Sequence, residues 1–190
     1  MDGAARKPFG GNVAQYLEAL LSIPGVGAAA VYPAWGGGGT VLASVAGPGG
    51  EPASPGLVAQ VKARMDPEGG EGEGLGLAPI GHRVTVTTPL RREVGVSMSL
   101  TLDHAQPAMA AAQVAEAIGA HFARARAQWG HDRRALSVYR ANITAEAMGV
   151  PGVVNVEGLR LDGLDADLHL VDRAEPGGQE LPYLGHLEIN

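Results

Sequence analysis

The sequence predicts an α+β fold made of two small lobes, each a short, mostly antiparallel sheet packed against one or two helices. Stretches with strand character follow one another largely as hairpins and do not alternate regularly with helices, which is typical of an α+β chain. Two alternating segments, residues 83–88 and 93–102, lie on either side of Pro89 and the charged residues 91–93. Proline interrupts a sheet because it lacks the backbone donor of the ladder, so we place the joint between the lobes here.

A helix that runs into a Pro-Gly pair and then into a hairpin occurs twice in the chain. The two copies contain Ile-Pro-Gly-Val at 23–26 and Val-Pro-Gly-Val at 150–153. Proline followed by glycine ends a helix and redirects the chain. The sequence leaves two explanations of the repeat open, a real duplication and a chance recurrence. We therefore expect a flexible N-terminus at residues 1–11, a first lobe at 12–89 with the order α-β-β-α-β, and a second lobe at 90–190 with the order β-α-α-β-β-β.

The composition supports a packed core and excludes several kinds of partner. Hydrophobic residues make up 45% of the chain but aromatic residues only 4%, so the core must be built from Val, Leu, Ile and Ala. The net charge is −6 and no polybasic run is present, so neither nucleic acid nor an anionic membrane has an electrostatic binding surface. The absence of cysteine excludes disulfides and thiolate metal sites. No apolar run approaches the roughly 18 residues of a membrane helix.

The first lobe is predicted to begin with a helix capped by Asn12, with Gln15 three positions on in the manner of a capping box. Pro24 and Gly25 end this helix, and two strands follow at 26–32 and 40–46. The apolar face of the helix is formed by Tyr16, Leu17, Leu20 and Leu21.

A second helix of this lobe is predicted to start at Ser54 and Pro55, an N-cap followed by proline in the first turn. The acidic, glycine-rich segment 66–76 cannot hold regular structure and is predicted to be a loop. The strand at 83–88 then closes the lobe. The apolar face of the second helix is formed by Leu57, Val58, Val61 and Met65.

The second lobe is predicted to open with the strand at 93–102, whose alternation gives one buried and one solvent-facing side. A long helix at 108–129 follows Pro107 and should bury Ile118 and Phe122. A shorter helix carries Leu136, Tyr139, Ile143 and Ala147 and ends at Gly149.

Three strands are predicted to complete the second lobe. In the first, a change of phase at Gly158 indicates a bulge. In the second, Asp165 and Asp167 alternate with leucine or alanine and should form its solvent-facing side. The three segments are 154–161, 164–170 and 185–189.

No group of residues in the sequence has the spacing of a known reactive site. The glycine run at 36–39 is followed by strand residues, so it is interpreted as a hairpin loop and not as a phosphate-binding loop. Asp162, Asp165 and Asp167 lack the spacing of a calcium loop, and no histidine pair has the i, i+4 spacing of a helical zinc site. The histidines are His82, His104, His121, His131, His169 and His186. We therefore predict no catalytic, cofactor-binding or metal-binding residues, and no small-molecule substrate.

Six short segments, taken in order, are similar to one protein family. They are Gly-Gly-Asn-Val-Ala-Gln-Tyr at 10–16, Ile-Pro-Gly-Val at 23–26, Ala-Val-Tyr-Pro-Ala-Trp-Gly at 30–36, Gly-Thr-Val at 39–41, Leu-Ala-Pro-Ile-Gly-His-Arg-Val-Thr-Val at 77–86 and Val-Pro-Gly-Val-Val-Asn-Val at 150–156. Together they resemble the baseplate J-like family of contractile phage tails and related contractile injection systems. The resemblance spans about residues 10–189.

The resemblance implies a structural role and no enzymatic activity. Family members look like the wedge component of a phage or prophage tail baseplate, where repeated copies help to form a ring. The implied partners are other baseplate or wedge proteins and copies of the same chain, in a virion tail assembled in the bacterial host cytoplasm, without a cofactor. Family members carry a substantial region before the Gly-Gly-Asn segment, whereas this chain starts almost there. We therefore expect a fragment, a trimmed homologue or an isolated domain that lacks part of the family's assembly surface.

Two other functions remain open at the level of the sequence. A hydrolase-like enzyme with an unrecognised site would require the scattered histidines and aspartates to converge in one pocket. A calcium- or carbohydrate-binding adhesion module would require exposed aromatic residues beside a carboxylate cluster, and Trp35 and Trp129 are the only tryptophans.

Overall fold

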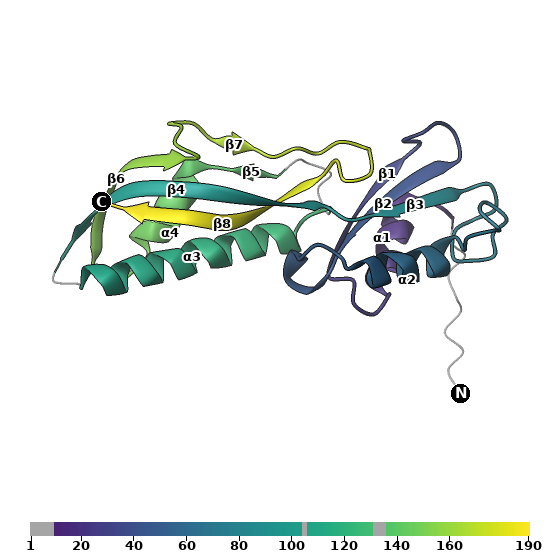
Figure 1. Cartoon of the computed structure of the whole chain (residues 1–190), viewed down its shortest axis with the longest axis horizontal. Coiled ribbons are helices and arrows are strands. Elements are labelled where there is room, and N and C mark those ends of the chain that lie inside the picture. Colours follow the sequence, from purple (N-terminus) through teal and green to yellow (C-terminus); the bar gives the residue numbers. More distant parts are fainter. Residues whose placement is uncertain (1–9, 104–105, 131–135) are drawn as a thin grey trace. The chain divides into compact units, whose positions relative to one another are not determined.

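A computed structural model describes residues 10–103, 106–130 and 136–190 (Figure 1). The chain divides into two compact units. The first contains Met1–Pro89 and Ala174–Gly177, and the second contains Leu90–Arg173 and Gly178–Asn190. Apart from Gly10 and Gly11, the expected flexible segment 1–11 lies outside the described residues, as do His104 and His131.

The first unit contains a three-stranded sheet with the order β1-β2-β3 and two helices. β1 and β2 form an antiparallel hairpin, whereas β3 runs parallel to β2. A parallel pair needs a long crossover, and the segment containing α2 supplies it. The elements are α1 Val13–Leu21, β1 Ala28–Pro33, β2 Thr40–Ala46, the 3-10 turn Pro48–Gly50, α2 Pro55–Met65 and β3 Arg83–Thr87.

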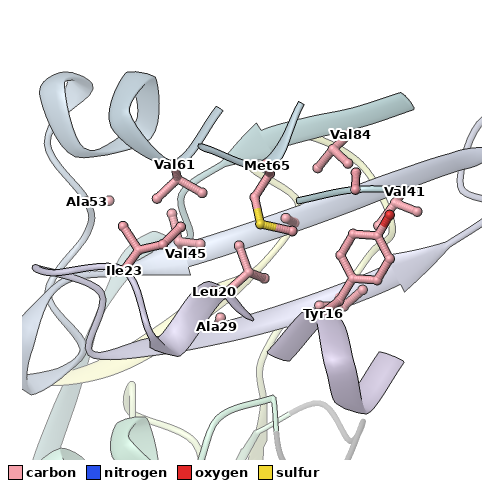
Figure 2. Close-up of a cluster of buried hydrophobic side chains, with 13 residues drawn as sticks. Tyr16, Leu20, Ile23, Ala29, Val41, Val45, Ala53, Val61, Met65 and Val84 are labelled. Carbon is pink, nitrogen blue, oxygen red and sulfur yellow. The ribbon is translucent and has the colours of Figure 1, made fainter. Parts of the chain in front are cut away.

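The core of the first unit lies between the two helices and one face of the sheet. Figure 2 shows Tyr16 and Leu20 from α1, and Val61 and Met65 from α2, among the clustered side chains. Each of the four side chains is at most 1% exposed. The helix faces predicted from the sequence are therefore confirmed for these residues, whereas Leu21, at the last position of α1, is 38% exposed.

Both predicted N-caps of the first unit are confirmed. The Asn12 side chain accepts a hydrogen bond from the Gln15 amide at 2.9 Å, and Ser54 Oγ accepts one from the Leu57 amide at 3.2 Å. Each cap satisfies a backbone donor that the first turn of a helix leaves without a partner. Gln15 Oε1 accepts a hydrogen bond from the Gly10 amide at 2.5 Å, so this side chain reaches beyond the capping residue to order the chain before it.

The second unit contains a three-stranded sheet with the order β6-β4-β8 and a two-stranded ribbon, β5-β7. β4 pairs antiparallel with β6 and parallel with β8, so the fold is α+β with mixed sheets. Ile118 and Phe122 are at most 1% exposed, as predicted. The elements are β4 Leu90–Leu102, α3 Pro107–Ala127, β5 Ser137–Val138, α4 Arg140–Met148, β6 Val153–Leu161, β7 Leu168–His169 and β8 Glu180–Ile189.

The structure corrects two local predictions in the second unit. The helix expected from Leu136 begins only at Arg140, because residues 137–138 form β5 and pair with β7. The strand expected at 164–170 is reduced to β7. Asp167 lies outside that strand and accepts a hydrogen bond from the Arg140 amide at 2.8 Å, and Asp165 forms an ion pair with Arg140. The Asp167 carboxylate therefore stabilises the positive N-terminal end of α4. Both aspartates are exposed, as predicted, but neither lies in a strand.

The bulge predicted in β6 is confirmed. The register between β4 and β6 shifts between Ser97 and Ser99, and Gly158 has φ of 62°. The turn after β6 also has positive φ at Asp162 and Gly163, 49° and 78°. Two successive positive φ values define a type I′ turn, the kind that matches the twist of a hairpin.

The two Pro-Gly segments adopt the same turn. Gly25 and Gly152 have φ of 94° and 87°. The amides of Val26 and Val153 each donate to the carbonyl three residues back, at 3.1 Å in both cases. Proline followed by glycine with positive φ defines a type II turn. In both units this turn leads from a helix into the strand that pairs antiparallel with the central strand of the sheet.

Gly25→Ala is expected to lower the free energy of unfolding by about 1–2 kcal/mol, because alanine is strained at positive φ. The new Cβ would also lie 3.2 Å from Leu57 Cδ1. Gly38→Ala is the matched control, since its Cβ would meet no atom within 4 Å. Urea denaturation of both variants tests the prediction, and an equal effect of the two substitutions would contradict it.

The two three-stranded sheets have the same arrangement of strands, but the strands follow one another in a different order along the chain. Each has a central strand, an antiparallel neighbour that follows a helix and a Pro-Gly turn, and a parallel neighbour. In the first unit the antiparallel neighbour β1 directly precedes the central strand β2. In the second unit the central strand β4 comes first, and β6 follows only after α3, β5 and α4.

Candidate interaction surface

The residues considered for catalysis or metal binding lie in separate places. His82 Nδ1 lies 2.9 Å from Tyr16 Oη in the first unit. In the second unit His121 pairs with Glu146 between α3 and α4, and His169 pairs with Ser137 between β5 and β7. Within the described ranges, no group of three or more His, Asp or Glu side chains is placed to hold a metal ion.

The glycine run at 36–39 is confirmed as the loop of the β1–β2 hairpin. Thr40 Oγ1 accepts a hydrogen bond from the Gly36 amide at 2.9 Å and donates one to the Gly37 carbonyl at 2.7 Å. A Cβ at Gly39 would lie 2.6 Å from the Gly81 carbonyl oxygen, so this glycine permits close packing of two backbones. None of the helices in the described part of the chain is long and apolar enough to span a membrane.

The segment that joins α2 to β3, residues 66–82, is fixed by a buried carboxylate; we call it the α2–β3 loop. Asp66 is 1% exposed. Its carboxylate accepts hydrogen bonds from the Val84 amide at 2.8 Å, the Gly72 amide at 2.9 Å and Lys62 Nζ at 3.1 Å. One side chain thus joins the end of α2, the middle of the loop and the start of β3.

The second half of the α2–β3 loop is held against the end of α2. The Leu77 and Ala78 amides donate to the Arg64 and Met65 carbonyls at 3.1 and 2.8 Å. A Cβ at Gly76 would lie 2.4 Å from the Met65 carbonyl oxygen, so this approach requires glycine. At the end of the loop, the stacked pair formed by Tyr16 and His82 connects it to α1. The loop is therefore anchored at both ends and in the middle.

Large apolar side chains project from this anchored loop into solvent. Ile80 is 81% exposed, Leu75 is 67% exposed and Leu77 is 39% exposed. A Cβ at Gly74 would lie 2.7 Å from Ile80 Cγ1, so Ile80 lies against the residue that directly precedes Leu75. In the same loop the Ala78 side chain is only 4% exposed. The loop therefore contains a buried apolar position next to the exposed ones. Exposed apolar groups on an ordered loop are characteristic of a contact surface.

The pKa values of two groups near the loop are shifted by their surroundings. Burial acts to raise the pKa of Asp66, but the hydrogen bonds from Val84, Gly72 and Lys62 outweigh it and hold the pKa below its usual range. Burial, assisted by the charge of Asp66, raises the pKa of Tyr16 to about 12. The Tyr16 hydroxyl therefore stays protonated throughout the neutral pH range.

The stability of the first unit should depend on the ionisation of Asp66. Because its folded-state pKa lies below the unfolded value of about 3.9, the stabilisation is present above about pH 4 and is lost as the pH falls through the folded-state pKa. Urea midpoints of the native chain and of Asp66→Asn should converge on acidification from pH 7 towards pH 2. A difference between the two proteins that stays constant with pH would contradict this assignment.

Comparison with known proteins finds a family match within the first unit. Residues 8–88 match the family model described as the baseplate J-like central domain. The match ends directly before Pro89 and includes the whole α2–β3 loop with Asp66, Leu75 and Ile80. The family resemblance expected from the sequence is therefore confirmed over these residues, while its extension through residues 150–156 stays a prediction.

Two proteins of Bacillus subtilis (strain 168) are similar to part of the chain. "Phage-like element PBSX protein XkdT" is 44% identical over 92 residues, which is 48% of this chain and 26% of that protein. "Uncharacterized protein YqbT" is 42% identical over 92 residues, with the same shares. The chain thus matches about a quarter of the length of these relatives.

Proposed function

We propose that the chain is a structural component of a tail baseplate, in a phage or a prophage-derived contractile device, and that it acts by protein–protein assembly and not by catalysis. The observation that carries the proposal is the match of residues 8–88 to the baseplate J-like central domain. The similarity to a protein named after a phage-like element supports it. The proposed location is the baseplate of the tail, after assembly in the bacterial host cytoplasm.

Within the baseplate, we propose a place in the wedge, with copies of the chain and other wedge proteins as partners. In a symmetric ring many moderate contacts add up, so each pairwise contact can be weak in isolation. The isolated chain should therefore sediment as a monomer or a weak dimer. It should join larger assemblies when it is co-expressed with the other baseplate proteins of the same phage. Failure to join any of them, or measurable turnover of a substrate that is lost on substitution of a histidine, would overturn the proposal.

We also propose that the two units are two domains with a boundary at Pro89. The sheet β1-β2-β3 and the sheet β6-β4-β8 have separate buried clusters, and the family match ends at residue 88. The segment Ala174–Gly177 belongs to the first unit, where the Gly177 amide donates to Thr87 Oγ1 at 3.1 Å. The first domain therefore consists of two stretches of sequence, and a fragment that ends at residue 89 would lack one of them.

A further inference from the structure

We propose that the α2–β3 loop docks its apolar side chains into an apolar depression with a basic rim on another protein of the baseplate. The inference rests on the proposed function and adds the contact surface and the chemistry of the partner. Leu75, Leu77 and Ile80 are the contact residues, and Glu68 and Glu73 supply the charge.

The first argument is that the backbone of the loop is fixed before any partner binds. Asp66 holds the loop to β3 and to α2, the Gly81 amide donates to the Gly72 carbonyl at 2.7 Å, and Tyr16 holds His82. A contact surface that is already ordered loses less conformational entropy on binding than one that must fold first. Leu75 and Ile80 are therefore exposed although the backbone that carries them is fixed.

The second argument is that Leu75 and Ile80 each lie over a glycine of the same loop. Ile80 lies against Gly74, and Leu75 lies against Gly70, where an added Cβ would be 2.5 Å from Leu75 Cδ1. Glycine at these positions leaves room for the two large side chains above the backbone. Exposed apolar side chains form the centre of protein interfaces, surrounded by a polar rim.

The third argument concerns charge. Between residues 66 and 82 the sequence contains acidic residues but no Lys or Arg. Asp66 is neutralised by Lys62, which also lies 4.0 Å from Glu71. Glu68 and Glu73 are exposed, and within the described residues neither side chain makes a hydrogen bond or ion pair. A partner surface with basic residues around its apolar centre would complement these carboxylates.

A second copy of the chain fits this surface less well. In a two-fold contact the same patch meets itself, so Glu68 and Glu73 of one copy would face the same carboxylates of the other. Like charges brought together at an interface disfavour the contact. A head-to-tail contact between copies would still need a basic surface on the second copy, and the chain has a net charge of −6 and no polybasic run. The complementary surface is therefore assigned to a different protein.

The test uses the full chain co-expressed with the other baseplate proteins of the same phage. Leu75→Asp/Ile80→Asp should reduce the co-purified partner about tenfold or more, because it removes the apolar centre of the interface. Leu164→Asp is the matched control, since Leu164 is 64% exposed and lies in the second unit. The melting temperatures of both variants should stay close to that of the native chain, because the substituted side chains are exposed.

Two further measurements define the partner. A photo-crosslinking amino acid at position 80 should label one baseplate protein, at an apolar segment flanked by Lys or Arg, whereas the same group at position 164 should not. Glu68→Gln/Glu73→Gln should make partner binding less sensitive to salt, because fewer charges remain to be screened.

The possible failures are distinguishable. If the native chain binds baseplate proteins and the loop variant binds them equally well, the docking inference is wrong and the proposed function stands. Crosslinks that join position 80 only to a second copy of the chain would overturn the choice of partner. If the native chain binds no baseplate protein at all, the proposed function fails and the inference fails with it.

Discussion

Replacing Ile118 with aspartate is expected to unfold the second unit. The Ile118 side chain is fully buried on α3, in a cluster that includes Val94 and Val96 of β4. A carboxylate there would have no water and no cationic partner, and the packing of the isoleucine would be lost as well. The expected loss in free energy of unfolding is about 4 kcal/mol or more, which is a large part of the stability of a domain of this size.

Ala112→Asp is the control for this substitution, because Ala112 is an exposed residue of the same helix. It introduces the same charge into the same helix without burying it. Urea denaturation measures both variants, and hydrogen exchange shows where protection is lost. If the two units are separate domains, protection should fall in β4, β6 and β8 before it falls in β2. Normal stability of the Ile118 variant would show that the assignment of this core position is wrong.

Asp66→Asn is expected to cost about 3 kcal/mol in the first unit. The carboxylate oxygens accept hydrogen bonds from the Val84 and Gly72 amides and from Lys62. Asparagine has one oxygen and one NH₂ group in their place, so a donor would face a backbone amide. Lys62 would in addition lose its close ion-pair partner. The Glu71 carboxylate would remain nearby, with its Oε1 4.0 Å from Lys62 Nζ.

Glu68→Gln is the control for the Asp66 substitution, because it makes the same chemical change two residues away at an exposed position. It should alter the stability by no more than about 0.5 kcal/mol. Urea denaturation at pH 7 gives the free energies, and a Glu-specific protease should cleave the α2–β3 loop faster in the Asp66 variant. Equal stability of the two variants would contradict the anchoring role of Asp66.

Local chemistry explains the features that the sequence predicted well. The caps at Asn12 and Ser54 depend on bonds to residues three positions away, and the turns at Gly25 and Gly152 depend on adjacent residues. The loop after α2 was evident from its glycines. Such signals lie within a few residues of the structure that they determine, so a single sequence contains them.

The features that the sequence did not reveal depend on distant partners. β5 has only two residues, and its partner β7 lies about thirty residues further along the chain. Asp167 follows a strand-like alternation, but its hydrogen bond goes to the start of α4 at Arg140. Both were misinterpreted because local periodicity does not contain contacts of this range.

The sequence does not reveal the candidate contact surface, for the same reason. The sequence indicated a loop at 66–76 but not its order, because Asp66 is fixed by Val84 from the next strand. The exposure of Leu75 and Ile80 likewise depends on how the loop is held. The available signal was the presence of large apolar residues in a glycine-rich segment without helical or strand periodicity.

The different chain orders of the two sheets have a consequence for how the protein folds. The central strand of the first unit meets its antiparallel neighbour across a short hairpin, Ala28 with Ala46 and Pro33 with Val41. In the second unit Leu90 pairs with Glu180, and Leu102 pairs with Val153. Closing such long loops costs entropy before any contact compensates for it, and folding slows as contacts become less local. The β1–β2 hairpin should therefore form early, whereas β4 has to wait for both of its neighbours, exposing its apolar face while the later residues are still being synthesised.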